Sequence, residues 1–213
     1  MKISLDRYKL VVFDLDGTLV HTTSEYRYSI VPKVLETLGK SPDNFNFHAI
    51  DKFWFDGERD QTIRDKLDCD PKIFWKVFHK YDKPEKRVKF TKIYDDVNPT
   101  LEKLRKMDKI LAIATGAPQK IAEMEINLLP KHLFTKIISV YSTRYKNKPH
   151  PESLLACLKF CKTKTDQSVY IGNSNDDSIY AKSAGVDFIY IERREHPFGG
   201  SSIATIHTLF DLL

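Results

Sequence analysis

Cysteine is scarce in this chain, with three residues of this type among 213. So low a count fits a protein of a reducing compartment. Cys157 and Cys161 are four residues apart in a segment that also carries Leu154 and Leu158, and residues at this spacing share one face of a helix. The pattern therefore favours thiols in a hydrophobic core over a pair of metal ligands.

Long hydrophobic runs are also absent. No apolar stretch approaches the roughly 18 residues that a membrane-spanning helix requires. The first residues, 1–7, run directly into a predicted strand, so we expect no signal peptide. These absences predict a cytoplasmic protein with no membrane partner.

Runs of like charge are missing as well. Lys and Arg number 34 against 29 Asp and Glu, a net charge of +5, but no run of five or more like charges occurs. A scattered surplus of this size predicts no nucleic-acid partner, and it is consistent with attraction to small anionic substrates.

The most informative feature that is present lies at residues 9–18. A run of apolar, largely β-favouring residues ends in Asp14 and Asp16, followed by Gly17. Residues two apart on a strand share a face, so both carboxylates can converge just beyond the carboxyl end of the strand. That end is where open α/β sheets bind ligands, and two adjacent carboxylates need a cation or a proton between them.

Three later segments supply polar groups of matching chemistry. One strand-like run ends in Thr115 and Gly116, a hydroxyl and free backbone N–H groups suited to a phosphoryl oxygen. Lys148 stands in a proline-rich loop, and the run at 169–171 leads into Asn173 and a cluster of oxygen ligands suited to Mg²⁺. Taken singly, each has an ordinary alternative: a helix cap, a solvated lysine and an Asx turn.

In this order, the four segments resemble the four motifs of the haloacid dehalogenase superfamily of hydrolases. The resemblance covers both ends of the chain and leaves out only residues from about 21 to 88. It implies a phosphatase of the phosphoglycolate-phosphatase-like kind, which hydrolyses a small phosphorylated metabolite through an aspartyl-phosphate. Asp16 favours a phosphatase over a dehalogenase, because dehalogenases of this family lack the second Asp.

The resemblance also implies a role for each matching residue. Asp14 is the nucleophile, and Asp16 is the general acid and then the general base. Thr115 and the Gly116 backbone N–H bind the phosphoryl oxygens, while Lys148 offsets their negative charge.

The implied cofactor is Mg²⁺, held by Asp14, the backbone carbonyl of Asp16 and the fourth motif. Here the sequence departs from the family, because Asn173 stands where the usual metal ligand is Asp. An amide oxygen can coordinate Mg²⁺ but brings no charge, so we expect weaker metal binding unless Asp177 or Asp176 compensates. Asp177 is favoured, since it matches the second acidic position of the family.

Two alternatives to the phosphatase remain open. A sugar phosphomutase of the same superfamily shares every catalytic residue named above. A non-catalytic binding or regulatory protein would keep the fold with weakened chemistry, and Asn173 is its only support.

Hydrophobic periodicity predicts an α/β fold with a doubly wound parallel sheet, because strands alternate with helices. The strands are expected at 9–13, 110–114, 137–141, 169–171 and 187–191, and the helices at 97–107, 118–127, 152–160, 177–184 and 203–213.

The domain organisation follows from the same reasoning. Residues 1–20 and 89–213 are expected to form the Rossmann-like catalytic core, and residues 21–88 an inserted α-helical cap. Helical patterns near 30–38, 58–67 and 72–81 support the cap. Its aromatic residues are expected to form its own core more often than to stack on a substrate; they include Trp54, Phe55, Trp75 and Phe78.

Overall fold

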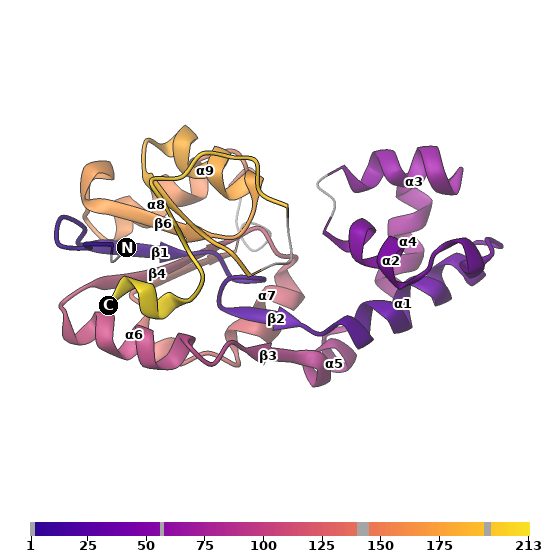
Figure 1. Cartoon of the computed structure of the whole chain (residues 1–213), viewed down its shortest axis with the longest axis horizontal. Coiled ribbons are helices and arrows are strands. Elements are labelled where there is room, and N and C mark those ends of the chain that lie inside the picture. The colour runs from indigo at the N-terminus through magenta and orange to yellow at the C-terminus, as the bar shows by residue number, and fades with distance from the viewer. Residues whose placement is uncertain (1–2, 56–57, 140–144, 194–196) are drawn as a thin grey trace. The chain divides into compact units, whose positions relative to one another are not determined.

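The computed structural model describes residues 3–55, 58–139, 145–193 and 197–213 (Figure 1). The chain divides into two compact units. The α/β unit comprises Met1–His21 and Lys92–Leu213, and the inserted unit comprises Thr22–Thr91.

The α/β unit is built on a six-stranded sheet in which all neighbouring strands are parallel. In sheet order, the strands are β5 (Lys136–Ser139), β4 (Ile110–Thr115), β1 (Leu10–Phe13), β6 (Ser168–Gly172), β7 (Asp187–Ile191) and β8 (Ala204–Ile206). Every residue of β1 is buried, as a central parallel strand requires. The predicted doubly wound parallel sheet is confirmed, although residues 140 and 141 of one predicted strand lie outside the described residues.

Helices cover both faces of this sheet (Figure 1). On one face lie α8 (Glu152–Phe160) and α9 (Asn175–Ala184), and on the other lie α6 (Val97–Lys106) and α7 (Gln119–Ile126). Cys157, a residue of α8, is buried in the hydrophobic core, where burial raises the pKa of its thiol to about 12. The predicted core position of this cysteine is therefore confirmed.

The C-terminal segment differs from the prediction, since residues 203–213 do not form a helix. Residues 204–206 instead extend the parallel sheet as β8, paired with β7. Leu209–Leu212 then form a single 3-10 turn. The hydroxyl of Thr208, which caps the turn, and the backbone N–H of Leu209 donate to the Asp96 carboxylate. Ile206, Leu209 and Leu212 are buried in this arrangement. Their spacing is also compatible with a helix, so it could not distinguish a helix from a strand followed by a turn.

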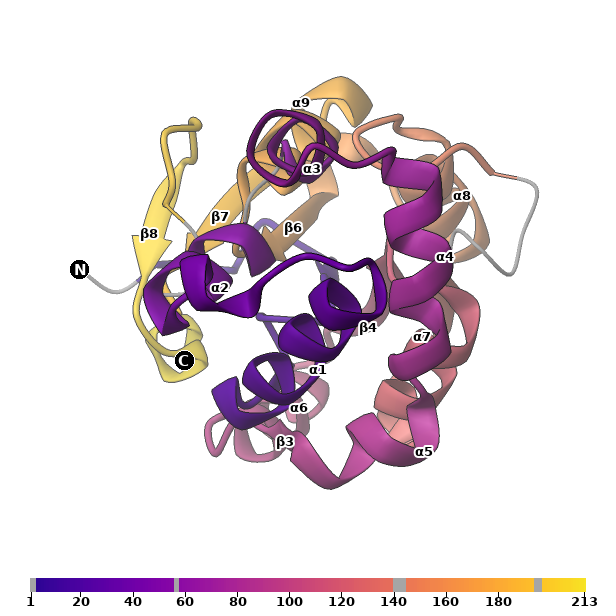
Figure 2. The same ribbon diagram turned by 90° about the vertical axis from the view of Figure 1, so that its right-hand side faces the viewer.

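The inserted unit is helical (Figure 2). Its helices are α1 (Ser24–Thr37), α2 (Phe47–Trp54), α3 (Arg59–Leu67), α4 (Pro71–Tyr81) and the short α5 (Pro84–Arg87). Helix α1 packs against both α2 and α4. The short strands β2 (Val20–Thr22) and β3 (Thr91–Ile93) pair where the chain passes between the units. Among the described residues, no helix is both long and apolar enough to span a bilayer.

Aromatic side chains form much of the interior of the inserted unit. Phe53 and Phe74 are buried with ring centroids 5.5 Å apart, and Phe78 is buried beside them. Trp54 and Trp75 are partly buried against the same cluster. These contacts favour the interpretation of the aromatic residues as the core of a helical bundle.

Candidate active site

Several predicted site residues lie at the carboxyl ends of three neighbouring strands, β4, β1 and β6. Phe13, the last residue of β1, pairs with Ile113 of β4 and Ile171 of β6. The next residue, Asp14, donates its backbone N–H to the carbonyl of Ile171 at 2.8 Å. Parallel strands that end in register bring the residues after them to the same edge, so the sheet itself positions Asp14 between the ends of β4 and β6.

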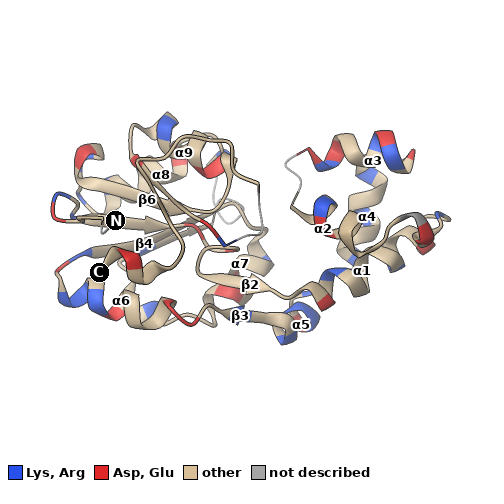
Figure 3. Cartoon of the chain, viewed as in Figure 1, with Lys and Arg blue, Asp and Glu red and all other residues tan. Residues whose placement is uncertain are grey.

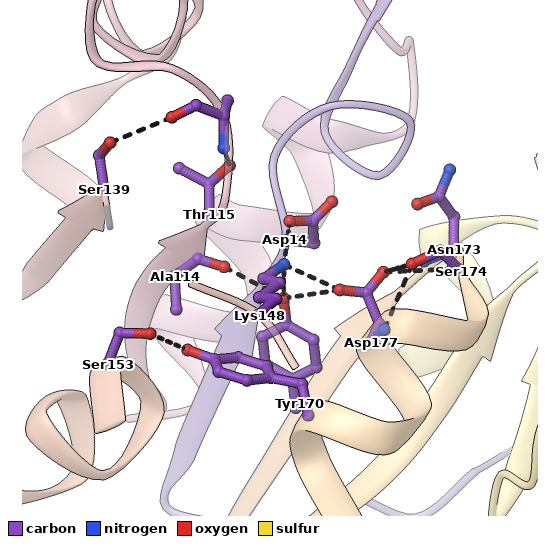
Figure 4. Close-up of polar contacts among 12 residues, drawn as sticks. Asp14, Ala114, Thr115, Ser139, Lys148, Ser153, Tyr170, Asn173, Ser174 and Asp177 are labelled. Atoms are coloured by element: carbon purple, nitrogen blue, oxygen red, sulfur yellow. Dashed lines mark hydrogen bonds and ion pairs between the residues drawn. The ribbon is translucent and has the colours of Figure 1, made fainter. Parts of the chain in front are cut away.

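Lys148 joins two carboxylates at this edge (Figure 4). Its Nζ lies 2.5 Å from Asp14 Oδ1 and 2.8 Å from Asp177 Oδ1, and it donates to the Tyr170 hydroxyl at 2.6 Å. An ammonium has three protons, and these three acceptors use all of them. The side chain is only 10% exposed, so the charge pairs lie largely out of solvent.

Burial and the charge of the partner shift the pKa values of Asp14 and Lys148 in opposite directions. Burial raises the pKa of Asp14 to about 7, although the neighbouring Lys148 opposes the rise and Asp177 adds to it. Burial alone would lower the pKa of Lys148, but Asp14 and Asp177 outweigh it and raise that pKa above its usual value. Near neutral pH the site therefore holds a permanent cation beside a carboxylate that is poised to change its charge.

Asp177 has a double role at the start of α9. Its Oδ2 accepts from the Ser174 hydroxyl at 2.7 Å and from two backbone N–H groups, those of Asn173 and Ser174, which completes a capping box. Its Oδ1 accepts from Lys148 and from Tyr170. Burial would raise the pKa of Asp177, but Lys148 and the hydrogen bonds hold it below its usual value.

Gly172 is required for this arrangement because Asp177 lies directly over it. A Cβ at position 172 would stand 2.6 Å from the Asp177 Cγ, closer than real Cβ contacts allow. The glycine that ends β6 therefore admits the carboxylate that holds Lys148.

Asn173 presents a buried amide without a described partner. The residue is 3% exposed, and its Nδ2 makes no hydrogen bond among the described residues. A buried amide group costs free energy unless it finds a partner. The unpartnered Nδ2 can only donate a hydrogen bond, whereas the amide oxygen of the same side chain is a ligand type that a hard divalent cation accepts.

Few carboxylates are available to bind a cation at this site. Within the described ranges, no three His, Cys, Asp or Glu side chains gather as a metal cluster. A cation here would depend on Asp14, the Asn173 amide and backbone carbonyls, and both Asp177 oxygens are already engaged as described above. The predicted metal roles of Asp14, Asp16, Asn173 and Asp177 stay predictions.

The other predicted residues lie at the end of β4 and in the turn after β1. Thr115 ends β4 and is buried, and its Oγ1 accepts the N–H of Ala117 at 3.1 Å, which leaves the hydroxyl proton available (Figure 4). At Gly116 an added Cβ would meet the Asn147 side chain at 2.9 Å, so the backbone runs close to the loop that carries Lys148. Asp16 is partly buried in the turn after β1, where Gly17 has a φ of 77°.

Two tyrosines near Lys148 were missed by the sequence reasoning. Besides accepting from Lys148, the Tyr170 hydroxyl lies 3.1 Å from the Ala114 carbonyl and from Asp177 Oδ1. The Lys148 ammonium lies 5.2 Å from the Tyr170 ring centroid and 5.3 Å from that of Tyr180. In the sequence, Tyr170 looks like one more core residue of a buried strand, and nothing around it indicates a polar role.

The chain is similar to known proteins over most of its length. The chain matches the family model described as haloacid dehalogenase-like hydrolase over residues 11–191. It is 27% identical over 194 residues to the phosphoglycolate phosphatase of Mannheimia succiniciproducens, covering 84% of this chain and 83% of that protein. It is 24% identical over 181 residues to the pyrophosphatase PpaX of Bacillus mycoides, covering 85% and 82% respectively.

A solved structure shows the same architecture. The crystal structure of a phosphatase of this family from Thermococcus onnurineus superimposes with a TM-score of 0.69 at 27% identity, over 96% of this chain and 95% of that one. The family model covers far more than half of the chain, including the strands that carry Asp14, Thr115 and Asn173. The chain belongs to the haloacid dehalogenase-like hydrolases.

Proposed function

We propose that this protein is a Mg²⁺-dependent phosphatase that hydrolyses a small phosphorylated metabolite through an aspartyl-phosphate on Asp14. The observation that carries the proposal is the position of Lys148 Nζ between Asp14 and Asp177, beyond the end of β1. An ammonium held there can neutralise the charge of an incoming phosphoryl group. The phosphatase names of the two relatives support the same chemistry.

In the first half-reaction, a carboxylate oxygen of Asp14 attacks phosphorus, and the bond from phosphorus to the ester oxygen breaks. Asp16 gives its proton to the leaving alkoxide. In the second half-reaction, Asp16 takes a proton from water, which attacks phosphorus and frees phosphate and the Asp14 carboxylate. Thr115 donates its hydroxyl proton, and Gly116 its backbone N–H, to the phosphoryl oxygens throughout.

Asp14, the Asp16 carbonyl and the Asn173 amide would hold the Mg²⁺, with Asp177 reached through water. The bound ion supplies positive charge that reduces the repulsion between the nucleophile and the phosphate.

The inserted unit would act as a cap that supplies substrate contacts and excludes water. Because the three cysteines are free, the reducing cytoplasm is the proposed compartment.

The test is hydrolysis of a generic aryl phosphate by the purified protein, with and without Mg²⁺, beside the Asp14→Asn variant. We expect Mg²⁺-dependent phosphate release that falls by at least about 10³-fold in the variant, because an amide cannot form the covalent intermediate. Asp166→Asn is the control and should keep full activity, since Asp166 is an exposed carboxylate of the same unit outside the proposed site. Release that survives Asp14→Asn would contradict the covalent route, and phosphoryl exchange without net release would favour the phosphomutase.

A second prediction concerns the unusual amide of the fourth motif. Replacing Asn173 with aspartate adds a negative charge to the proposed donor set, so the Kd for Mg²⁺ should fall about tenfold. Titration calorimetry with MgCl₂ measures this directly, without substrate. Unchanged Mg²⁺ affinity in Asn173→Asp would show that this side chain does not contact the metal.

A further inference from the structure

The inserted unit contains a cavity that the proposed chemistry does not use. Its volume is about 310 Å³, and it lies between α1, α5 and the 3-10 turn Val88–Phe90. Three lysines line it, Lys33, Lys86 and Lys89, and we call it the lysine pocket. Figure 3 marks the basic residues of α5 in blue.

The three ammonium groups have no described counter-ion. None of Lys33, Lys86 and Lys89 forms an ion pair or a side-chain hydrogen bond among the residues that the structure describes. Three like charges around one small cavity repel each other, and they attract anions into it. The lysine pocket therefore carries three exposed lysines and no carboxylate in its lining.

The other polar groups of the pocket already have partners. The Tyr26 hydroxyl donates to Asp82 Oδ1 at 2.7 Å, and Ser29 Oγ donates to the Tyr26 carbonyl at 2.7 Å. The Tyr81 hydroxyl is 2.7 Å from Thr37 Oγ1. The lysines are consequently the groups that remain to recognise a ligand, and as cations that donate but do not accept hydrogen bonds they favour an anion.

A larger cavity of the same unit has a different lining. It measures about 460 Å³ and also has three lysines in its lining, but Asp68 lines it as well. One of these lysines, Lys40, already donates to the Asp68 backbone carbonyl at 3.1 Å. The lining of the lysine pocket thus differs from that of the larger cavity in having no carboxylate, although Lys52 and Lys66 of the larger cavity also form no ion pair among the described residues.

We propose that the lysine pocket binds a small organic phosphate, with the phosphoryl group held by the three ammonium groups. Lysine binds phosphate as a point charge, and three charges match a doubly charged anion better than a single carboxylate. Ile30 and Phe90 offer apolar surface to the organic part of the ligand. The volume lies at the lower end of the range of about 300–1,000 Å³ that is typical of small-molecule sites.

The probe is phenylphosphonate, whose phosphorus–carbon bond a phosphatase does not hydrolyse, titrated at mildly alkaline pH into the ¹⁵N-labelled full chain. We expect amide shifts around Lys33, Lys86 and Phe90 that saturate independently of any shifts at Gly116 and Asn173. In the variant Lys33→Gln/Lys86→Gln/Lys89→Gln, the Kd measured from the pocket amides should rise at least about tenfold. Benzoate has the same phenyl ring but carries a carboxylate with a single negative charge. It should bind at least about tenfold more weakly than phenylphosphonate.

The matched control is Lys72→Gln/Lys76→Gln/Lys80→Gln, which removes the same charge from exposed positions on α4 of the same unit. It should leave the pocket Kd unchanged. Equal weakening in both triple variants would reduce the effect to net charge and overturn the proposal, as would an absence of pocket shifts. Benzoate binding as tight as phenylphosphonate binding would overturn the assignment to phosphates.

Discussion

Replacing Lys148 with methionine should lower kcat for aryl phosphate hydrolysis by about 10²–10³-fold. The variant keeps the length of the side chain but removes the charge that pairs with Asp14 and Asp177. Because Lys148 holds the pKa of Asp14 down to about 7, its loss should raise that pKa further. Asp14 must be ionised to attack phosphorus, so the acid limb of the rate should move to higher pH, and a pH profile of kcat/KM measures the shift.

A stability control is needed, because breaking a buried ion pair costs about 3–5 kcal/mol of unfolding free energy. Lys109 provides one within the same unit: it is also buried, and its Nζ donates to the backbone carbonyls of Leu5 and Tyr8 at 2.7 and 2.8 Å. Lys109→Met should lower the melting temperature but leave kcat and the pH profile unchanged. If Lys148→Met and Lys109→Met lost activity equally, the charge of Lys148 would have no specific role.

Gly172→Ala should lower both activity and stability although it adds a single methyl group. The new Cβ would stand 2.6 Å from Asp177 Cγ, and Asp177 cannot retreat easily because its Oδ2 is held by the start of α9. Overpacking of this kind costs about 1–3 kcal/mol of unfolding free energy. Displacement of Asp177 also misplaces Lys148, so kcat should fall at least about tenfold. Thermal melts and steady-state kinetics measure the two effects.

Gly199 serves as the matched control for this substitution. A Cβ there meets nothing within 4 Å, so Gly199→Ala should behave like the unmodified protein. Normal kinetics in Gly172→Ala would mean that Asp177 can shift without moving Lys148, and the link between the two residues would be refuted.

The parts of the fold that could be predicted are those with strong local patterns. The apolar run before Asp14 became β1 at the centre of the sheet, and residues 152–160 became α8 with the predicted bounds. The order of the motifs placed Asp14, Thr115 and Asn173 at neighbouring strand ends, since a parallel sheet leaves little choice about where its carboxyl ends meet. The structure brings Asp14, Lys148 and Asp177 together there.

The remaining features depend on contacts between distant residues. Residues 204–206 are a strand because β7 offers an unpaired edge, which a helical spacing of apolar residues cannot reveal. The short strands β2 and β3 exist only as a pair, 69 residues apart at Thr22 and Thr91. Tyr170 acquired polar partners because Lys148 and Asp177 arrive from other segments, so its role is invisible in its own strand.

Asp177 also links the folding of the chain to its chemistry. One of its oxygens closes the first turn of α9 and the other holds Lys148, so a single carboxylate anchors a helix and orients a charged side chain. Variation at this position is therefore constrained twice. In the proposed mechanism, a substitution that removed the helix cap would also misplace Lys148. Variants selected for thermal tolerance near α9 would then change in turnover even where turnover was not screened.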